Sequence, residues 1–377
     1  MTWDITGMGA VACVGDTPSG IFDSLCAGRD GLGALQVFDH DKYRARQAYE
    51  ITDRARPGVD EPARATRWLV AAIDQALADA GHSDDLADVP VLVGTTLQEQ
   101  RSAELWWRHG APLDPGALHF GTALKERYGA TRTYTFANAC AATLYALAMG
   151  TDLIELGEAD TVVVAGTDSI GESAYGTLDR VQNEVPGALR PFDRSHAGML
   201  MGEGAVAVVL TRAAGPGRQV HARLRAVGVN CDAHHSTAPD PEGITRVLHE
   251  THRRAEVAPR DIDLVMLHGS GTPKNDSTEA AVLSRMFPAG SGPLMTAVKS
   301  MTGHTLGGSG LLSLVMAAIA LQRGQVPPVL GLVDPIEEAA GLRLVRDKAA
   351  AADLTLAQID AFGFGGINAA AILEAAR

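Results

Sequence analysis

The chain has 377 residues, a formal net charge of -13 and 46% hydrophobic residues, a size and composition that suit two ordinary domains or one double-sized fold. Nucleic acids and anionic membranes bind basic surfaces, so the negative charge argues against both as partners. The longest apolar run, Leu311 to Leu321, is too short to span a bilayer, and residues 1–20 lack the features of a signal peptide. We therefore expect a cytoplasmic protein.

The first half alternates predicted helices and strands. Apolar residues at helical spacing predict a helix from Arg64 to Ala80, and a short apolar run predicts a strand from Val89 to Val93. A strand from Thr133 to Phe136, a helix from Cys140 to Leu156 and a strand from Thr161 to Ala165 follow. Strands separated by helices predict an α/β fold with parallel pairing.

The second half repeats this order. It has a predicted helix from Ile244 to Glu256, a strand from Ile262 to Leu267, a strand from Leu294 to Val298, a helix from Gly307 to Leu321 and a strand from Val326 to Leu330. We therefore predict two βαβ-rich halves, 1–220 and 221–377, that meet in a turn-rich stretch near residues 215–225.

Two similar halves suggest a pseudo-twofold structure of five layers. Both central helices are nearly all apolar and rich in small residues, as burial between two sheets requires. The alternative is two separate Rossmann-like domains. Neither half has the Gly-x-Gly-x-x-Gly phosphate loop after its first strand, so no dinucleotide cofactor is expected.

Cys140 stands where a strand gives way to a helix. Unpaired N–H groups and the positive end of the helix dipole can stabilise a thiolate at such a position. Most cysteines are inert core residues, so position alone does not identify a nucleophile. The other cysteines, Cys13, Cys26 and Cys231, show no paired spacing, and we expect neither a disulfide framework nor a metal site.

Glycine-rich segments at 268–279, 298–310 and 362–368 put polar groups where strands end or helices begin. Two of the twelve histidines stand out there, although a lone histidine is more often structural. His268 ends an apolar strand, and His304 lies in the turn that opens the helix matching the Cys140 helix. By the internal symmetry they face Cys140. A cysteine with two histidines suits acyl transfer followed by stabilisation of an enolate.

With these motifs the sequence resembles the β-ketoacyl-acyl carrier protein synthases of the Cys-His-His kind, condensing enzymes of fatty acid or type II polyketide synthesis. The family pattern H-G-T-x-T-P-x-x-D-x-x-E is met at residues 268–279, with Ser270 in place of a threonine, and K-S-x-x-G-H is met at residues 299–304. The likeness runs over nearly the whole chain. It implies the thiolase fold, an α/β structure with five αβαβα layers.

The resemblance also implies roles. Cys140 would take an acyl group as a thioester from an acyl carrier protein, and the backbone N–H groups of Cys140 and Phe364 would form the oxyanion hole. His268 and His304 would hydrogen-bond the thioester carbonyl of malonyl-carrier protein, so that loss of CO₂ leaves a stabilised enolate. Phe364 resembles the family's gate, which separates acylation from condensation.

Further residues follow from the same resemblance. Lys299 and Glu279 would order the histidines through an ion pair. The residues expected to bind substrate are Thr272, Asp232, His235, Gly365, Gly366 and Ile367. No cofactor is implied. The family's dimer, formed through a sheet edge, implies a homodimer or a heterodimer with a related ketosynthase or chain-length-factor subunit.

The sequence also departs from the family. Ile367 stands where the family commonly has threonine, and the segments 97–120 and 173–190, which shape the acyl pocket in the family, look shorter than usual. The acyl chain length therefore stays open.

Four other readings compete. Thiolases would need a second cysteine in the C-terminal third, and the Cys-His-Asn condensing enzymes would need an asparagine near His304; this chain has neither. A non-catalytic chain-length factor would usually lack the nucleophile. An acyltransferase that moves the acyl group without decarboxylation stays open, although both histidines being present weighs against it.

Overall fold

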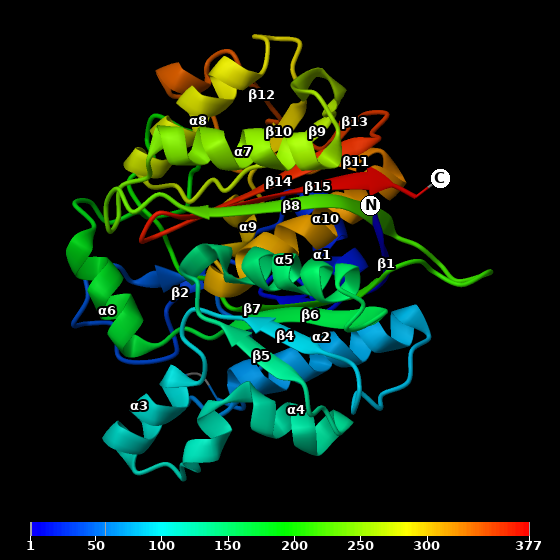
Figure 1. Cartoon of the computed structure of the whole chain (residues 1–377). Coiled ribbons are helices and arrows are strands. Elements are labelled where there is room, and N and C mark those ends of the chain that lie inside the picture. Colours follow the sequence, from blue (N-terminus) through cyan, green and yellow to red (C-terminus); the bar gives the residue numbers. More distant parts are fainter. Residues whose placement is uncertain (1, 57, 377) are drawn as a thin grey trace.

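The computed structural model describes residues 2–56 and 58–376, and within them helices and strands alternate in five layers (Figure 1). Helices cover the two outer faces, and two helices lie between the two layers of strands. From the top of Figure 1, the helix layers are α7 (Pro241–Ala255) with α8 (Pro273–Met286), α5 (Ala142–Glu155) with α10 (Ser309–Arg323), and α2 (Arg64–Ala80) with α4 (Phe120–Tyr128). The predicted αβαβα layering is confirmed.

The first-half strands lie in the order β5 (Thr133–Phe136), β4 (Val91–Gly94), β6 (Thr161–Asp168), β7 (Gly204–Thr211) and β1 (Trp3–Ala12). Strand β4 pairs parallel with β5 and β6, whereas β7 pairs antiparallel with β6 and β1. The parallel strands are joined through helices, as predicted.

The second-half strands follow the same plan, in the order β12 (Arg343–Leu344), β10 (Leu294–Thr296), β9 (Leu264–Met266), β14 (Leu356–Gly363), β15 (Ile367–Ala375) and β8 (Ala222–Cys231). Strand β1 pairs with β8 over Trp3–Ile5 and Ala222–Leu224, which joins the halves in one eleven-stranded sheet. By position, β5, β4, β6, β7 and β1 correspond to β10, β9, β14, β15 and β8.

One predicted strand is wrong. Of the segment from Val326 to Leu330, only Val326 belongs to a strand. That strand, β11 (Gln325–Val326), pairs with β13 (Ala350–Ala351) outside the large sheet. Pro327 and Pro328 follow directly, and proline has no N–H to donate to a ladder. The true counterpart of β6 is β14, nearer the C-terminus.

Several boundaries also differ. Helix α7 begins at Pro241, before the predicted Ile244, because the Asp240 side chain accepts hydrogen bonds from the N–H groups of Glu242 and Gly243 and caps the helix. Cys140 lies in a short 3-10 turn, η2 (Ala139–Ala141), directly before α5.

The remaining elements are short or peripheral. They are α1 (Pro18–Cys26), α3 (Gln100–His109), α6 (Glu172–Val181), α9 (Lys299–Thr302), β2 (Gly33–Ala34), β3 (Gln47–Ala48), η1 (Pro115–Leu118), η3 (Pro259–Asp261), η4 (Leu306–Gly308) and η5 (Glu337–Ala339).

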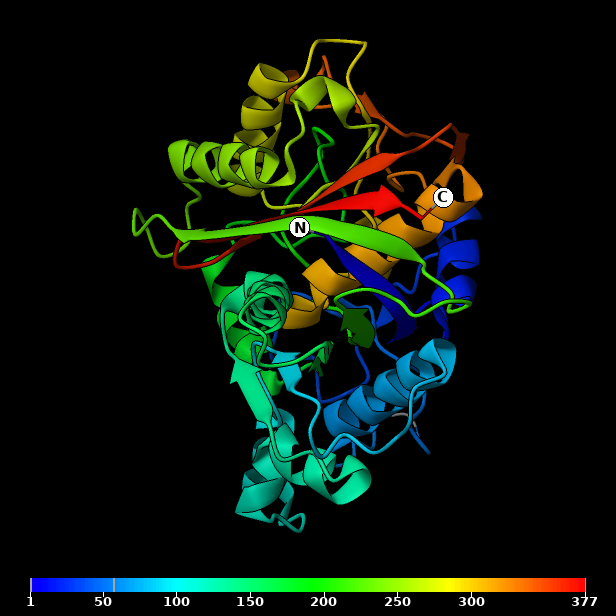
Figure 2. The same ribbon diagram turned by 45° about the vertical axis from the view of Figure 1, so that its right-hand side comes forward.

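The two central helices bring the halves together at their N-terminal ends. Figure 2 shows α10 crossing the middle of the molecule between the strand layers. The Thr143 hydroxyl in α5 donates to the Gly307 carbonyl at 2.8 Å and accepts the Leu311 N–H at 3.1 Å. The Ser309 hydroxyl donates to the Cys140 carbonyl at 3.4 Å. These bonds hold the start of each helix against the other.

The stretch Leu306–Arg323 is long and apolar enough to cross a membrane, the one helical stretch to pass that test within residues 2–56 and 58–376. It is 89% buried inside the fold, as a core helix of a globular protein is.

The contact between β1 and α2 gives a test of how tightly the outer helix is packed. A methyl group on Gly9 would lie 2.0 Å from the backbone oxygen of Ala72, which cannot move without the helix. We expect Gly9→Ala to lower the free energy of unfolding by about 1–3 kcal/mol, measured by denaturant unfolding. Gly33→Ala is the control, because no described atom lies within 4 Å of the added methyl. Equal stability of both variants would contradict this packing.

Candidate active site

Cys140 is buried at the bottom of a pocket between the halves. The turn between β14 and β15 forms part of the same pocket wall, and Cys140 is 8% exposed. The backbone N–H groups of Phe364 and of Cys140 itself lie near enough to its sulfur to lower the pKa of the thiol. The structure therefore brings together the two N–H groups expected to form an oxyanion hole.

His304 is held in one orientation. Its N–H donates to the Leu200 carbonyl and its carbonyl accepts the Gly202 N–H, both at 2.9 Å. Its Nδ1 accepts the Leu306 N–H at 3.0 Å, so the proton of the neutral ring is on Nε2. That Nε2 is buried without a hydrogen-bond partner in the described part of the chain. It is a donor kept free for a ligand.

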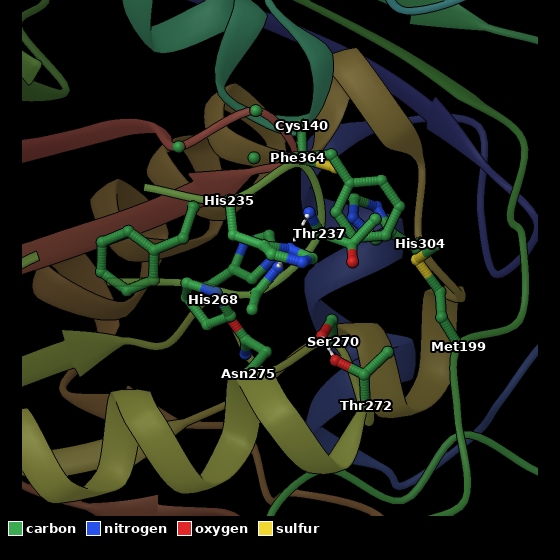
Figure 3. A pocket seen from close by; sticks show the side chains of 16 residues that line it. Cys140, Met199, His235, Thr237, His268, Ser270, Thr272, Asn275, His304 and Phe364 are labelled. Carbon is green, nitrogen blue, oxygen red and sulfur yellow. Dashed lines mark hydrogen bonds between the residues drawn. The ribbon is translucent and has the colours of Figure 1, made fainter. Parts of the chain in front are cut away.

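His268 lies against His304, with 5.5 Å between the ring centres and the rings at 75° (Figure 3). Its backbone is held from two sides. Glu279 accepts the N–H groups of His268 at 2.6 Å and of Gly269 at 2.9 Å, and the Lys299 ammonium donates to the His268 carbonyl. The expected ion pair is not a direct contact among the described residues, although the charges of Lys299 and Glu279 each shift the pKa of the other toward its ionised form. Each residue instead binds the His268 backbone.

Burial keeps both histidines neutral. It lowers the pKa of His268 and of His304 well below the usual value, and the Lys299 ammonium lowers both further. Burial also lowers the pKa of Lys299 and raises that of Glu279. Because a neutral imidazole still donates one hydrogen bond, the pair can stabilise developing negative charge without titrating near neutral pH.

Burial disfavours the thiolate form of Cys140. It raises the pKa of the thiol to about 11, although the Lys299 ammonium and the N–H groups of Phe364 and Cys140 pull it down. The start of α5 alone therefore does not produce the thiolate that its position suggested.

The pocket around these residues is a cavity of about 30 Å³, enough for about one or two water molecules. It is lined by Cys140, Met199, His235, Thr237, Ala238, Pro239, His268, Ser270, Thr272, Asn275, His304 and the 362–366 turn (Figure 3). The expected substrate-binding residues Thr272, His235, Gly365 and Gly366 are among them.

Asp232 and Ile367 do not line this pocket. The Asp232 N–H donates to the Gly366 carbonyl at 2.9 Å, and its carboxylate accepts the His234 N–H and the Asn368 side-chain amide, each at 2.9 Å. Ile367 pairs with Cys231 in the sheet. Both residues lie behind the wall, where they support the turn that carries Phe364.

Cys140 also lines a second cavity, of about 380 Å³. Most of its wall is apolar; it is lined by Thr96, Leu97, Gln100, Ala139, Cys140, Ser173, Ala174, Thr177, Leu178, Val181, Met199, Met201, Leu306 and Phe364. This cavity can hold a hydrocarbon chain that is attached to the sulfur.

Two residues of the site were missed from the sequence. Asp168 is fully buried and accepts the N–H groups of Thr96, Leu97 and Gly307, so it ties the acyl-side loop to the turn after His304. Its polar side chain at the end of an apolar strand was the available signal. Met199 lines both cavities but stands in a loop without any pattern.

The described residues contain no group of three or more histidine, cysteine, aspartate or glutamate side chains that could hold a metal ion.

The pKa of Cys140 makes a prediction about its reactivity. Only the thiolate is alkylated, and a folded-state pKa near 11 means that the thiolate fraction grows as pH rises toward that value. We expect the rate of iodoacetamide labelling to rise about tenfold per unit between about pH 7 and 10. Peptide mass spectrometry of the Cys140 peptide measures it, and a plateau below about pH 9 would contradict the burial effect. Lys299→Met should slow the labelling, because it removes a charge that favours the thiolate.

Known proteins resemble this chain along its whole length. It is 27% identical over 406 residues to a 3-oxoacyl-acyl-carrier-protein synthase 2 of Coxiella burnetii, with 98% of this chain and 97% of that protein covered. A protein of the same name from Staphylococcus aureus gives 27% over 409 residues, with the same coverage.

Solved structures of similar proteins show the same resemblance. The ishigamide ketosynthase/chain length factor is 30% identical, with a TM-score of 0.89 and coverage of 100% of this chain and 99% of that one. A beta-ketoacyl synthase from Burkholderia phymatum is 25% identical, with a TM-score of 0.86 and the same coverage. The thiolase fold expected from the sequence is confirmed.

Two family models match directly. The beta-ketoacyl synthase N-terminal domain matches residues 4–215, and the C-terminal domain of the same family matches residues 221–333. The chain therefore belongs to the beta-ketoacyl synthase family of condensing enzymes.

Proposed function

We propose that this protein joins an acyl group held on Cys140 to malonyl-acyl carrier protein, with loss of CO₂, and releases a 3-oxoacyl-acyl carrier protein. One observation carries the proposal: a buried thiol and two neutral imidazoles share one cavity, and the same thiol also lines a second, mostly apolar cavity. An acyl chain and a malonyl group can thus each occupy a cavity of their own beside the sulfur.

In the first half-reaction, the Cys140 sulfur attacks the thioester carbonyl of the acyl-carrier protein. The N–H groups of Cys140 and Phe364 stabilise the oxyanion. The bond from that carbon to the carrier sulfur then breaks, and the carrier thiol leaves with the proton that Cys140 gave up. The Lys299 ammonium assists, because its charge favours the thiolate.

In the second half-reaction, malonyl-carrier protein occupies the histidine side. Its bond to the carboxylate carbon breaks, CO₂ leaves, and the electron pair stays as an enolate whose oxygen accepts hydrogen bonds from His268 and His304. The enolate carbon attacks the acyl carbonyl, the Cys140 thiolate leaves, and it takes up a proton from solvent water. Neutral donors stabilise this charge without giving up the proton too early.

The partners follow from the family. The curated relatives are named for an acyl carrier protein, and one similar structure is a ketosynthase with a chain length factor. This supports an acyl carrier protein as the substrate carrier, and a dimer either with itself or with a related subunit. We also propose a cytoplasmic enzyme whose halves divide at residues 220 and 221. Fatty acid and polyketide pathways both fit this activity.

A chain-length factor and an acyltransferase without decarboxylation are the alternatives. Cys140 with its two N–H groups argues against the first. The free Nε2 of His304 argues against the second, because acyl transfer alone has no use for a donor on that side.

Separate loss of the two half-reactions tests the proposed roles. Incubation with acyl-carrier protein should add one acyl mass to Cys140, and malonyl-carrier protein should then give CO₂ and a 3-oxoacyl product. We expect Cys140→Ala to abolish the adduct. His304→Ala should retain it but slow CO₂ release by about 10²–10³-fold, as expected for loss of one charge-stabilising donor. Mass spectrometry and CO₂ release measure the two steps. No adduct on the wild-type protein would refute the condensing role, and an adduct without CO₂ would identify the acyltransferase.

The dimer can be tested at the edge of the sheet. Among the described strands, β5 pairs with β4 alone, and Tyr134 on it is 42% exposed. The carbonyls of Arg132 and Phe136 bond to β4, so by alternation the N–H of Thr135 faces the open edge. We expect Thr135→Pro to shift the protein from dimer to monomer in analytical ultracentrifugation, whereas Thr135→Ala keeps the N–H and the dimer. A dimeric Thr135→Pro would place the interface elsewhere.

A further inference from the structure

Met199 stands where the two cavities meet. The smaller cavity contains His268 and His304, and the larger one is almost entirely apolar. Within the described chain, only Cys140, Met199 and Phe364 line both. Besides the reacting sulfur, the partition between the cavities therefore consists of two side chains.

These two side chains differ in exposure. Phe364 is 43% exposed and is followed by Gly365, whose φ of +84 favours glycine. Met199 is 5% exposed. Figure 3 shows the Phe364 ring and the Met199 thioether on the same side of the pocket, next to His304. A partly exposed ring thus lies near a buried thioether.

The backbone at Met199 is clamped on both sides. Its N–H donates to the Gln182 side-chain oxygen, and a methyl group on Gly198 would lie 2.1 Å from that same oxygen. On the other side, the Leu200 carbonyl accepts the His304 N–H at 2.9 Å. Met199 cannot move away without disturbing either Gln182 or His304.

We propose that Met199 is a specificity-determining residue, the fixed half of a partition that Phe364 completes, and that it decides what the enolate reacts with. This rests on the proposed condensation. After CO₂ leaves, the enolate carbon can bond to the acyl carbonyl carbon, with the Cys140 sulfur as leaving group. It can instead take a proton from water, which leaves hydroxide and gives acetyl-carrier protein. Met199 keeps water in the acyl cavity from the reacting carbon.

A single-turnover experiment tests this. Cys140 is first loaded with an acyl group, the protein is separated from free carrier, and malonyl-carrier protein is added. The quenched carrier is then analysed by mass spectrometry for 3-oxoacyl and acetyl forms. We expect Met199→Ala to raise the ratio of acetyl to 3-oxoacyl product by roughly tenfold, because it opens the partition. Met199→Val, a smaller change, should raise it less.

Met201→Ala is the matched control. Met201 is buried and lines the acyl cavity but not the histidine cavity, so its truncation enlarges one cavity without opening the partition. The product ratio of this variant should stay at the wild-type value. An unchanged ratio in both Met199 variants, or an equal rise in Met201→Ala, would overturn the role of Met199. A wild-type protein that forms no 3-oxoacyl product would instead refute the condensation itself.

Discussion

A short backbone contact between the halves governs the geometry of the whole site. Met201 and His304 form a parallel bridge, in which Leu200 and Gly202 supply the hydrogen bonds. The approach is so close that a methyl group on Gly202 would lie 2.2 Å from the Thr302 oxygen. This contact fixes the turn that carries His304 to a loop of the first half, the same half that carries Cys140.

Buried charges support that contact from the first half. Glu203 follows Gly202 and is fully buried, and its two oxygens accept hydrogen bonds from the Arg64 guanidinium, each at 3.1 Å. Its neighbours Ile51 and Ile170 donate their N–H groups to the same carboxylate. A buried pair with every oxygen hydrogen-bonded specifies one arrangement of the chain, because moving either partner would leave a charge unpaired.

The same burial sets the chemistry. It lowers the pKa of both histidines and raises that of the thiol, so the two imidazoles and the thiol are uncharged at rest near neutral pH. Charge then develops only as the reaction proceeds, in a site with little water to screen it. The proposed role of Met199 fits this chemistry, because an apolar side chain keeps water away from the developing charge.

Local patterns in the sequence predicted much of this architecture. Helix α2 and strand β5 have the predicted bounds, because apolar spacing and short apolar runs are properties of neighbouring residues. The symmetry of the halves also pointed to Cys140, His268 and His304, which the structure does bring to one pocket. The strand predicted from Val326 to Leu330 does not form because Pro327 and Pro328 follow Val326.

Contacts between distant residues could not be predicted. The hydrogen bond from the Gly307 N–H to Asp168 joins residues 139 positions apart, and no periodic pattern in the sequence indicates such a pair. The roles of Met199 and Gln182 depend in the same way on loops that meet only in the folded chain. The lack of a direct contact between Lys299 and Glu279 has a similar origin, because the family motif gives residue types but not which backbone group each one binds.

The central claim is that burial holds His304 as a neutral hydrogen-bond donor, and ¹⁵N NMR of the histidine rings measures this directly. A pKa well below the usual value means that the ring stays neutral as the pH falls through about 6.5. We predict that His304 keeps a protonated Nε2 and an unprotonated Nδ1 from about pH 8 to 6, whereas an exposed histidine titrates in this range. A His304 ring that takes up a second proton near pH 6.5 would contradict the claim.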